Sequence, residues 1–170
     1  SLPLEQIVKP AIRKYAPMFI SKKLSLEMSS LTATVLTDEK WAQFIIEQIL
    51  SNSLKYTRTG GIRIFLEKKL SLDTDDVSIS IRNDDCNKVE NLTLVIEDTG
   101  IGIRAEDIPR IFEKGYTGVN GRDDNRATGI GLYLSNKIMR KLGHRLYITS
   151  AEGKGTKVFL EFSVEDLNMY

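Results

Sequence analysis

The chain has almost no cysteine and almost no histidine. Cys86 and His144 are the only residues of their types among 170. A single cysteine excludes an internal disulfide framework and fits a reducing compartment. A single histidine excludes a zinc site built from several histidine ligands. The two residues lie far apart in the sequence, so they do not predict a shared metal site.

The chain also lacks an excess of charge and any long apolar run. Its 24 basic and 23 acidic residues leave a formal net charge of +1. We therefore expect no nucleic-acid partner, because such binding needs a basic surface. The longest clean apolar stretches are a few residues, as in Leu94–Ile96, whereas a membrane-spanning helix needs about 18–20 residues. The chain starts without an initiator methionine, so we expect it to be a fragment or a processed chain.

The composition instead indicates one folded domain over residues 1–170. Domains typically contain about 100–200 residues. Apolar residues make up 41% of the chain and charged residues 28%, values that are ordinary for a globular protein and not for a disordered one.

Apolar residues at helical spacing predict three main helices. The first covers residues 4–20, the second follows an Asp38 cap and is stopped by Gly60-Gly61, and the third covers residues 131–142. A short helix is expected over residues 104–112. The predicted buried stripe of the second helix consists of Trp41, Phe44, Ile45 and Ile49.

Alternation of apolar and polar residues predicts seven short strands. They cover residues 25–29, 33–36, 62–68, 77–82, 92–97, 145–150 and 157–163. Polar turns separate the third, fourth and fifth of these runs, so we expect them to pair as an antiparallel meander. A sheet with one buried face needs a cover, which the helices can provide.

A long segment without periodicity precedes the last predicted helix. Residues Glu113–Thr128 contain three glycines and a charged patch at 122–126. A connection of about 15 residues is long enough to suggest a lid and not a simple connector.

The first motif with chemical meaning is Asp98-Thr99-Gly100-Ile101-Gly102, at the end of a predicted strand. A carboxylate at this place can accept a hydrogen bond from an exocyclic amine such as that of adenine. The two glycines allow a flat ring or a phosphate to approach the backbone. The alternative is an ordinary turn from a strand to a helix.

A second motif, Gly129-Ile130-Gly131-Leu132, opens the last predicted helix. Glycine-rich backbone at a helix N-terminus presents free N–H groups to phosphate oxygens. The alternative interpretation is a hinge followed by a helix start.

A third motif lies at the end of the second predicted helix. At about 100° per residue, Lys55 and Tyr56 each lie within about 60° of Asn52, so the three share one face. An amide oxygen can bind Mg²⁺, and a lysine can neutralise phosphate charge. The alternative is a solvated polar helix end.

The order and spacing of these motifs resemble the GHKL ATPase superfamily, and within it the catalytic ATP-binding domain of bacterial sensor histidine kinases. The asparagine box, first glycine box, phenylalanine box, second glycine box and closing strand turn of that family resemble residues 47–57, 97–103, 111–115, 128–132 and 153–156. The run over residues 112–122 is similar to Gram-positive kinases that sense peptide antibiotics such as bacitracin.

The resemblance implies an α+β fold, a two-layer α/β sandwich of the Bergerat type with a mixed, mainly antiparallel sheet. It implies Mg-ATP as cofactor, with Asn52 holding Mg²⁺ and with Asn52 and Lys55 in catalytic roles. Asp98 would receive the adenine amine with support from Thr156, and Phe112 would anchor the lid. The full implied binding set is Asn52, Lys55, Tyr56, Asp98, Gly100, Gly102, Phe112, Gly129, Gly131, Leu132 and Thr156.

The same resemblance implies two-component signalling. The domain would transfer the γ-phosphoryl group of ATP to a histidine on its own dimerisation domain, upstream of this chain, with a response regulator downstream. The intact protein would be a membrane-anchored homodimer with this domain in the cytoplasm. His144 follows Gly143 at a helix end, and we interpret it as structural and not as the acceptor.

Gln48 departs from the superfamily members that hydrolyse ATP, which carry a glutamate there to activate water. Glutamine is no base, and Glu47 lies about 140° from Asn52 around the helix. We therefore expect a site that holds ATP without rapid hydrolysis. Two alternatives are a serine kinase of the anti-sigma type, which carries that glutamate, and a non-catalytic nucleotide-sensing module.

Overall fold

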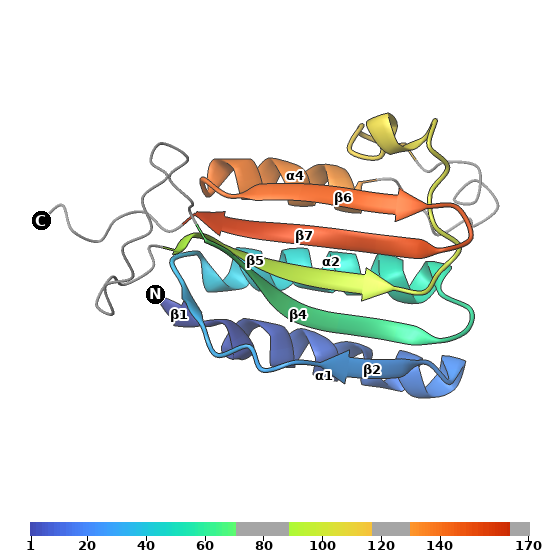
Figure 1. Ribbon diagram of the computed structural model, residues 1–170, viewed down its shortest axis with the longest axis horizontal. Coiled ribbons are helices and arrows are strands. Elements are labelled where there is room, and N and C mark those ends of the chain that lie inside the picture. The colour runs from blue at the N-terminus through green and yellow to red at the C-terminus, as the bar shows by residue number, and fades with distance from the viewer. Residues whose placement is uncertain (71–88, 117–129, 164–170) are drawn as a thin grey trace, which may run out of the picture.

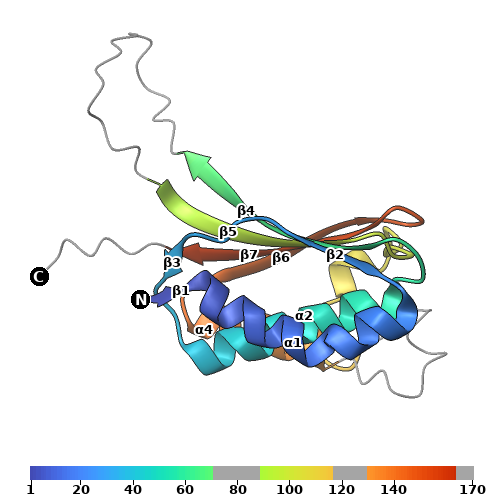
Figure 2. The ribbon, with the colours of Figure 1, turned by 90° about the horizontal axis from the view of Figure 1, so that it is seen from below.

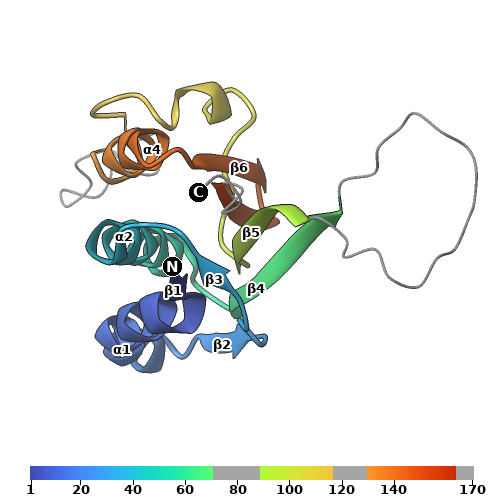
Figure 3. The same ribbon diagram turned by 90° about the vertical axis from the view of Figure 1, so that its left-hand side faces the viewer.

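The molecule has two layers, a five-stranded sheet and a set of helices that covers one of its faces (Figure 2). The computed structural model describes residues 1–70, 89–116 and 130–163. The covering helices are α1 (Leu4–Lys22), α2 (Glu39–Tyr56) and α4 (Gly131–Lys141). Figure 3 shows all three on the same side of the sheet.

The sheet is mixed and mainly antiparallel, as predicted. Its strands lie in the order β2 (Ser25–Met28), β4 (Gly61–Leu70), β5 (Val89–Asp98), β7 (Gly155–Ser163) and β6 (Arg145–Ala151). Only β2 and β4 run parallel. The two-residue strands β1 (Leu2–Pro3) and β3 (Thr34–Val35) form a separate antiparallel pair.

The core lies between the sheet and the helices because each strand places alternate side chains on the helical face. Ile62 and Ile64 of β4 and Leu94 and Ile96 of β5 are at most 1% exposed. The helices contribute Leu4, Ile7, Val8, Ile45, Ile46, Ile49, Leu50 and Leu54 to the same cluster. Full burial of a side chain of this kind stabilises the fold by about 1.5–3 kcal/mol.

The opposite face of the sheet carries a smaller apolar row across the strands. Val95 pairs in register with Phe65 and with Phe159, and Phe159 pairs with Tyr147. The rings of Tyr147 and Phe159 stack with centroids 4.6 Å apart. The guanidinium of Arg145 lies 4.8 Å from the Tyr147 ring centroid, so charged side chains border this row.

Helix α2 begins as predicted and ends earlier than predicted. The Asp38 carboxylate accepts a hydrogen bond from the Trp41 N–H at 2.9 Å, which satisfies a free donor of the first turn. Trp41 itself is 50% exposed, so its predicted place in the buried stripe is wrong. The helix ends at Tyr56 and not at Gly60, because the next residue, Thr57, is extended.

The short helix predicted for residues 104–112 is also wrong in extent. Only the 3-10 helix η1 (Ile108–Arg110) forms there, between turns in which Asp107 N–H donates to the Arg104 carbonyl and Glu113 N–H to the Arg110 carbonyl. Proline at 109 lies in the first turn of η1 and has no N–H to donate, which removes one hydrogen bond from a longer α-helix over residues 104–112 and weakens it.

Three predicted features lie outside the described residues. They are the strand at 77–82, most of the suggested lid at 113–128, and Gly129 of the second glycine box. Strands β4 and β5, on either side of the first of these, pair directly with each other. Among the described residues, no helix combines the length and the apolar character that crossing a membrane requires.

Two glycines in the turn between β6 and β7 should respond differently to alanine. Both have positive φ, +77° at Gly153 and +99° at Gly155. A methyl group at Gly153 would have no atom within 4 Å, whereas at Gly155 it would lie 2.0 Å from the Asp98 carbonyl oxygen. We expect Gly153→Ala to cost about 1–2 kcal/mol of unfolding free energy from backbone strain alone. Gly155→Ala should cost about 2 kcal/mol more from overlap. Urea unfolding measures both, and equal losses would contradict the packing described.

Candidate functional site

The centre of the candidate site is the carboxylate of Asp98, the last residue of β5. Asp98 pairs in register with Thr156 of β7 on one side and with Ile62 of β4 on the other. Its Oδ1 accepts hydrogen bonds from the N–H of Gly100 at 2.8 Å and from the N–H of Thr156 at 3.2 Å. Only 7% of the residue is exposed, so the carboxylate is held rigidly in a nearly dry setting.

Burial raises the pKa of the Asp98 carboxyl above its usual value. The N–H groups of Gly100 and Thr156 and the hydroxyl of Ser53 favour the charged form and oppose this rise, while the charge of Glu97 adds to it. Ser53 lies on α2 and is 3% exposed. The asparagine-bearing helix therefore touches Asp98 directly, through the residue that follows Asn52.

The glycines after Asp98 bring the chain against its neighbours. A methyl group at Gly100 would lie 2.7 Å from the carbonyl oxygen of Tyr56 and 2.8 Å from Oδ1 of Asp98. Gly102 has φ +71°, and a methyl group there would lie 2.0 Å from the Ala151 carbonyl oxygen. Contact with the chain accounts for both glycines, and their contact with adenine stays a prediction.

The end of α2 is joined to this turn. The carbonyl of Tyr56 accepts a hydrogen bond from the Ile101 N–H at 3.1 Å. The ammonium of Lys55 lies 5.3 Å from the centroid of the Tyr56 ring. Asn52, one turn earlier, is partly exposed. The structure thus brings the asparagine box and the first glycine box together, as the resemblance implies.

The first residue of α4 lies against α2. A methyl group at Gly131 would lie 2.6 Å from Oε1 of Gln48, so a side chain there would displace the Gln48 amide from its present place. Leu132 follows and is partly buried, whereas Gly129 is outside the described residues. Gln48 therefore connects the asparagine box to the second glycine box.

Glu47 lies on the other side of α2. Its carboxylate pairs with the ammonium of Lys14 on α1 at 2.6 Å and accepts a hydrogen bond from Gln43 at 3.1 Å. Burial alone would raise the pKa of Glu47, but the hydrogen bonds from Lys14 and Gln43 and the Lys14 charge lower it below its usual value. Glu47 is thus engaged away from Asn52, as the helical geometry predicted.

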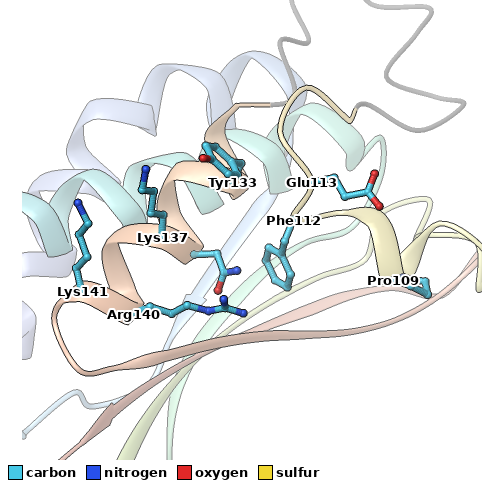
Figure 4. Close-up of a pocket in the computed structure, with 8 residues that line it drawn as sticks. Pro109, Phe112, Glu113, Tyr133, Lys137, Arg140 and Lys141 are labelled. Carbon is cyan, nitrogen blue, oxygen red and sulfur yellow. The ribbon is translucent and has the colours of Figure 1, made fainter.

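Phe112 is partly buried and packs against the main core. It also lines an open pocket of about 510 Å³ between the segment around η1 and the outer side of α4 (Figure 4). The lining residues are Pro109, Phe112, Glu113, Tyr133, Asn136, Lys137, Arg140 and Lys141. The pocket lies on a different side of α4 from Gly131, so it is not the Asp98 site.

His144 is buried at the end of α4, with 7% of its surface exposed. Its N–H donates to the Met139 carbonyl at 2.8 Å, and its ring meets the Phe162 ring edge-on with centroids 5.1 Å apart. This setting agrees with the structural role predicted for it.

Sequence reasoning missed two serines of the site. Ser150 Oγ accepts a hydrogen bond from the Ile103 N–H at 2.8 Å, donates to the Gly155 carbonyl at 2.9 Å and lies 2.8 Å from Thr156 Oγ1. Ser53 could have been found, because it continues the buried stripe of Ile45 and Ile49 with a polar side chain. Ser150 gave no such signal, since its partners come from two other segments.

Comparison with known proteins places these observations in a family. Residues 37–166 match the family described as histidine kinase-, DNA gyrase B-, and HSP90-like ATPase. The sensor protein kinase GraS of Staphylococcus aureus, in strains N315 and Newman, is 40% identical over 132 residues, which cover 78% of this chain and 33% of the relative. The chain thus spans about a third of the length of the curated relatives it matches. The predicted resemblance to Gram-positive sensor kinases is confirmed.

Two solved structures share the fold. Full-length ShkA in complex with AMPPNP has a TM-score of 0.72 at 18% identity, over 96% of this chain and 31% of that chain. The mycobacterial sensor histidine kinase MprB has a TM-score of 0.68 at 17% identity, over 95% of both chains. At these identities the likeness shows the fold alone, and it confirms the predicted two-layer sandwich. The sequence match and the site geometry together show that the chain belongs to the family of histidine kinase-, DNA gyrase B-, and HSP90-like ATPases.

Proposed function

We propose that this chain is the ATP-binding catalytic domain of a sensor histidine kinase, which transfers the γ-phosphoryl group of ATP to a histidine on another domain. The observation that carries the proposal is the enclosed Asp98 carboxylate, joined by hydrogen bonds to α2 and to β7. The family and the GraS relatives support the same reaction class.

The base of the nucleotide would be recognised at Asp98. Its carboxylate can accept a hydrogen bond from the exocyclic amine of adenine. Guanine presents a carbonyl oxygen at the corresponding ring position, so two acceptors would face each other in a site with little water, which is costly. The site thereby selects ATP over GTP.

The phosphates would lie between α2 and the N-terminus of α4. The free N–H groups at Gly131 and Leu132 can donate to phosphate oxygens, and Lys55 can neutralise part of their charge. Asn52 is partly exposed near this end of α2, and its amide oxygen suits Mg²⁺, which keeps water and phosphate oxygens as its other ligands. When bound, the ion neutralises charge on the transferred group.

ATP hydrolysis would be slow in this site. Gln48 has no carboxylate to activate water, and Glu47 is paired with Lys14 on the far side of the helix. Phosphoryl transfer needs positioning and charge neutralisation more than it needs a base. The same features therefore allow transfer to a histidine while limiting loss of ATP to water.

The acceptor and the other partners would belong to parts of the protein beyond this chain. We propose an upstream dimerisation domain with the acceptor histidine, a downstream response regulator, and a membrane-anchored homodimer that keeps this domain in the cytoplasm. The length of the curated relatives leaves room for these parts. His144 is buried, which argues against its being the acceptor.

Asp98→Asn tests the recognition of adenine. The amide keeps an oxygen, but its NH₂ group would face the adenine amine in a site with little water, so we expect ATP affinity to fall about tenfold to a hundredfold. Isothermal titration calorimetry with AMPPNP measures this, and circular dichroism confirms the fold. The control is Glu106→Gln, which changes an exposed carboxylate and should bind AMPPNP as wild type does. Unchanged affinity in the Asp98 variant would refute the proposed base site.

The same variant should make the domain more stable at neutral pH. A raised pKa means that folded Asp98 binds its proton more tightly than the unfolded chain does, so its contribution to stability is present at low pH and is lost as pH rises through that pKa. Asparagine keeps an acceptor for Gly100 and Thr156 without the charge. Urea unfolding should show Asp98→Asn ahead of wild type at pH 7, with the gap closing toward about pH 4. A variant less stable at pH 7 would contradict this.

Asn52 and Gln48 test the phosphate end of the site. With labelled ATP, this chain alone should stay unlabelled, and an added histidine-bearing domain should gain acid-labile phosphate. Asn52→Ala should reduce that labelling at least about a hundredfold through loss of the Mg²⁺ ligand, whereas Asn91→Ala, which loses the same amide at the far end of β5, should not. Labelling of His144 in the isolated chain, or rapid ATP hydrolysis by wild type that Gln48→Glu does not change, would overturn the mechanism.

A further inference from the structure

The segment between the first glycine box and Tyr116 is cross-linked by a single carboxylate. Asp107 Oδ1 accepts a hydrogen bond from the Tyr116 hydroxyl, and Oδ2 accepts one from Nε of Arg104 at 3.3 Å. The Asp107 side chain is only 15% exposed. The carboxylate therefore joins two residues that lie twelve positions apart in the sequence.

The Tyr116 ring is held from a second direction. The guanidinium of Arg110 lies 4.5 Å from its centroid, and Nε of Arg110 donates to Glu113 at 3.3 Å. The Tyr116 N–H donates to the Glu113 carbonyl at 3.2 Å. We call this set, Arg104, Asp107, Arg110, Glu113 and Tyr116, the Asp107 clamp.

The clamp is continuous with the Asp98 site. Arg104 directly follows Ile103, whose N–H is bound by Ser150 Oγ, and Ser150 also contacts Thr156. Gly102, one residue earlier, lies against the backbone of Ala151. A shift of Arg104 would therefore be passed to the turn that encloses Asp98. In Figure 1 the segment of η1 lies at the same end of the molecule as the β6–β7 turn and the last residues of α2 and β5.

The clamp also holds the residues of the phenylalanine box, which lie between Asp107 and Tyr116. Ile111 is 7% exposed, and Phe112 packs against the main core. Between Phe112 and Tyr116 the chain turns through Gly115, which has φ +79°. Asp107 thus links Tyr116, which directly follows the phenylalanine box, to Arg104, which directly follows the first glycine box.

We propose that Asp107 and Tyr116 are positioning residues for nucleotide binding, which hold the phenylalanine box at a fixed place relative to the first glycine box. This rests on the proposed function, and the residues act through the turn at Gly100–Ile103 without touching the nucleotide. The pKa of Asp107 is lowered by the Tyr116 hydrogen bond and by Arg104, so the clamp keeps its charge in neutral and mildly acidic solution.

The test compares Tyr116→Phe and Asp107→Asn with two matched variants. Tyr116→Phe keeps the ring over Arg110 and loses only the hydroxyl. Tyr147→Phe removes a hydroxyl from the opposite face of the sheet, and Glu27→Gln removes an exposed carboxylate on β2, away from the clamp. Calorimetry with AMPPNP should show about tenfold weaker binding in both clamp variants, the size expected from losing one hydrogen bond to a charged group. The matched variants should bind within about twofold of wild type.

Two further readouts separate positioning from a purely structural role. The double variant should bind more tightly than two independent losses would give, because both variants weaken the hydrogen bond between Tyr116 and Asp107. Amide hydrogen exchange at Gly100 and Ile103 should become faster in Tyr116→Phe and stay unchanged in Tyr147→Phe. Clamp variants that lose thermal stability but bind AMPPNP like wild type would overturn the inference. If wild type itself does not bind AMPPNP, the proposed function fails instead.

Discussion

The burial of the Asp98 carboxylate is the constraint on which the rest of the site depends. A charged group can leave water only if hydrogen bonds replace its hydration. Here the partners come from three parts of the chain, since Gly100 follows in the same turn, Thr156 lies on β7 and Ser53 lies on α2. Each partner must come very close, and this accounts for glycine at 155, where any side chain would meet the Asp98 carbonyl.

The carboxylates around this site are engaged in ways that bear on the slow hydrolysis proposed above. Of the two carboxylates near the asparagine box, Asp98 is engaged by backbone N–H groups and Glu47 by Lys14. Gln48, which faces the start of α4, is neutral and serves as a packing partner for Gly131. Both carboxylates are thus engaged in contacts within the domain. This arrangement suits a domain that presents a phosphoryl group to another domain.

Features that depend on local pattern could be predicted from the sequence. The periodicity of α1 and the alternation in β5 are repeated over many residues, so burial on one face determines the element. The Asp38 cap is also local, because the acceptor and the Trp41 N–H lie three residues apart. Asp98 was identified by its place at a strand end between apolar and glycine residues.

Features that depend on distant partners could not be predicted in the same way. The ammonium of Lys22 on α1 donates a hydrogen bond to the Leu54 carbonyl in the last turn of α2. The sequence around Leu54 does not indicate this contact. A glycine in a sequence shows that a side chain is absent, but not which neighbour excludes it. At Gly102 the excluding neighbour is the Ala151 backbone, which no local pattern indicates, and the predicted contact with adenine stays a prediction.

The contacts of α1 bear on which residues this domain needs in order to fold. The family match begins at residue 37, yet Leu4, Ile7 and Val8 are fully buried against the elements that follow. Lys14 and Lys22 of the same helix engage α2. The packed core therefore includes α1, which lies outside the residues that match the family. Any element fused ahead of this domain is joined through α1 to the helix that carries Asn52.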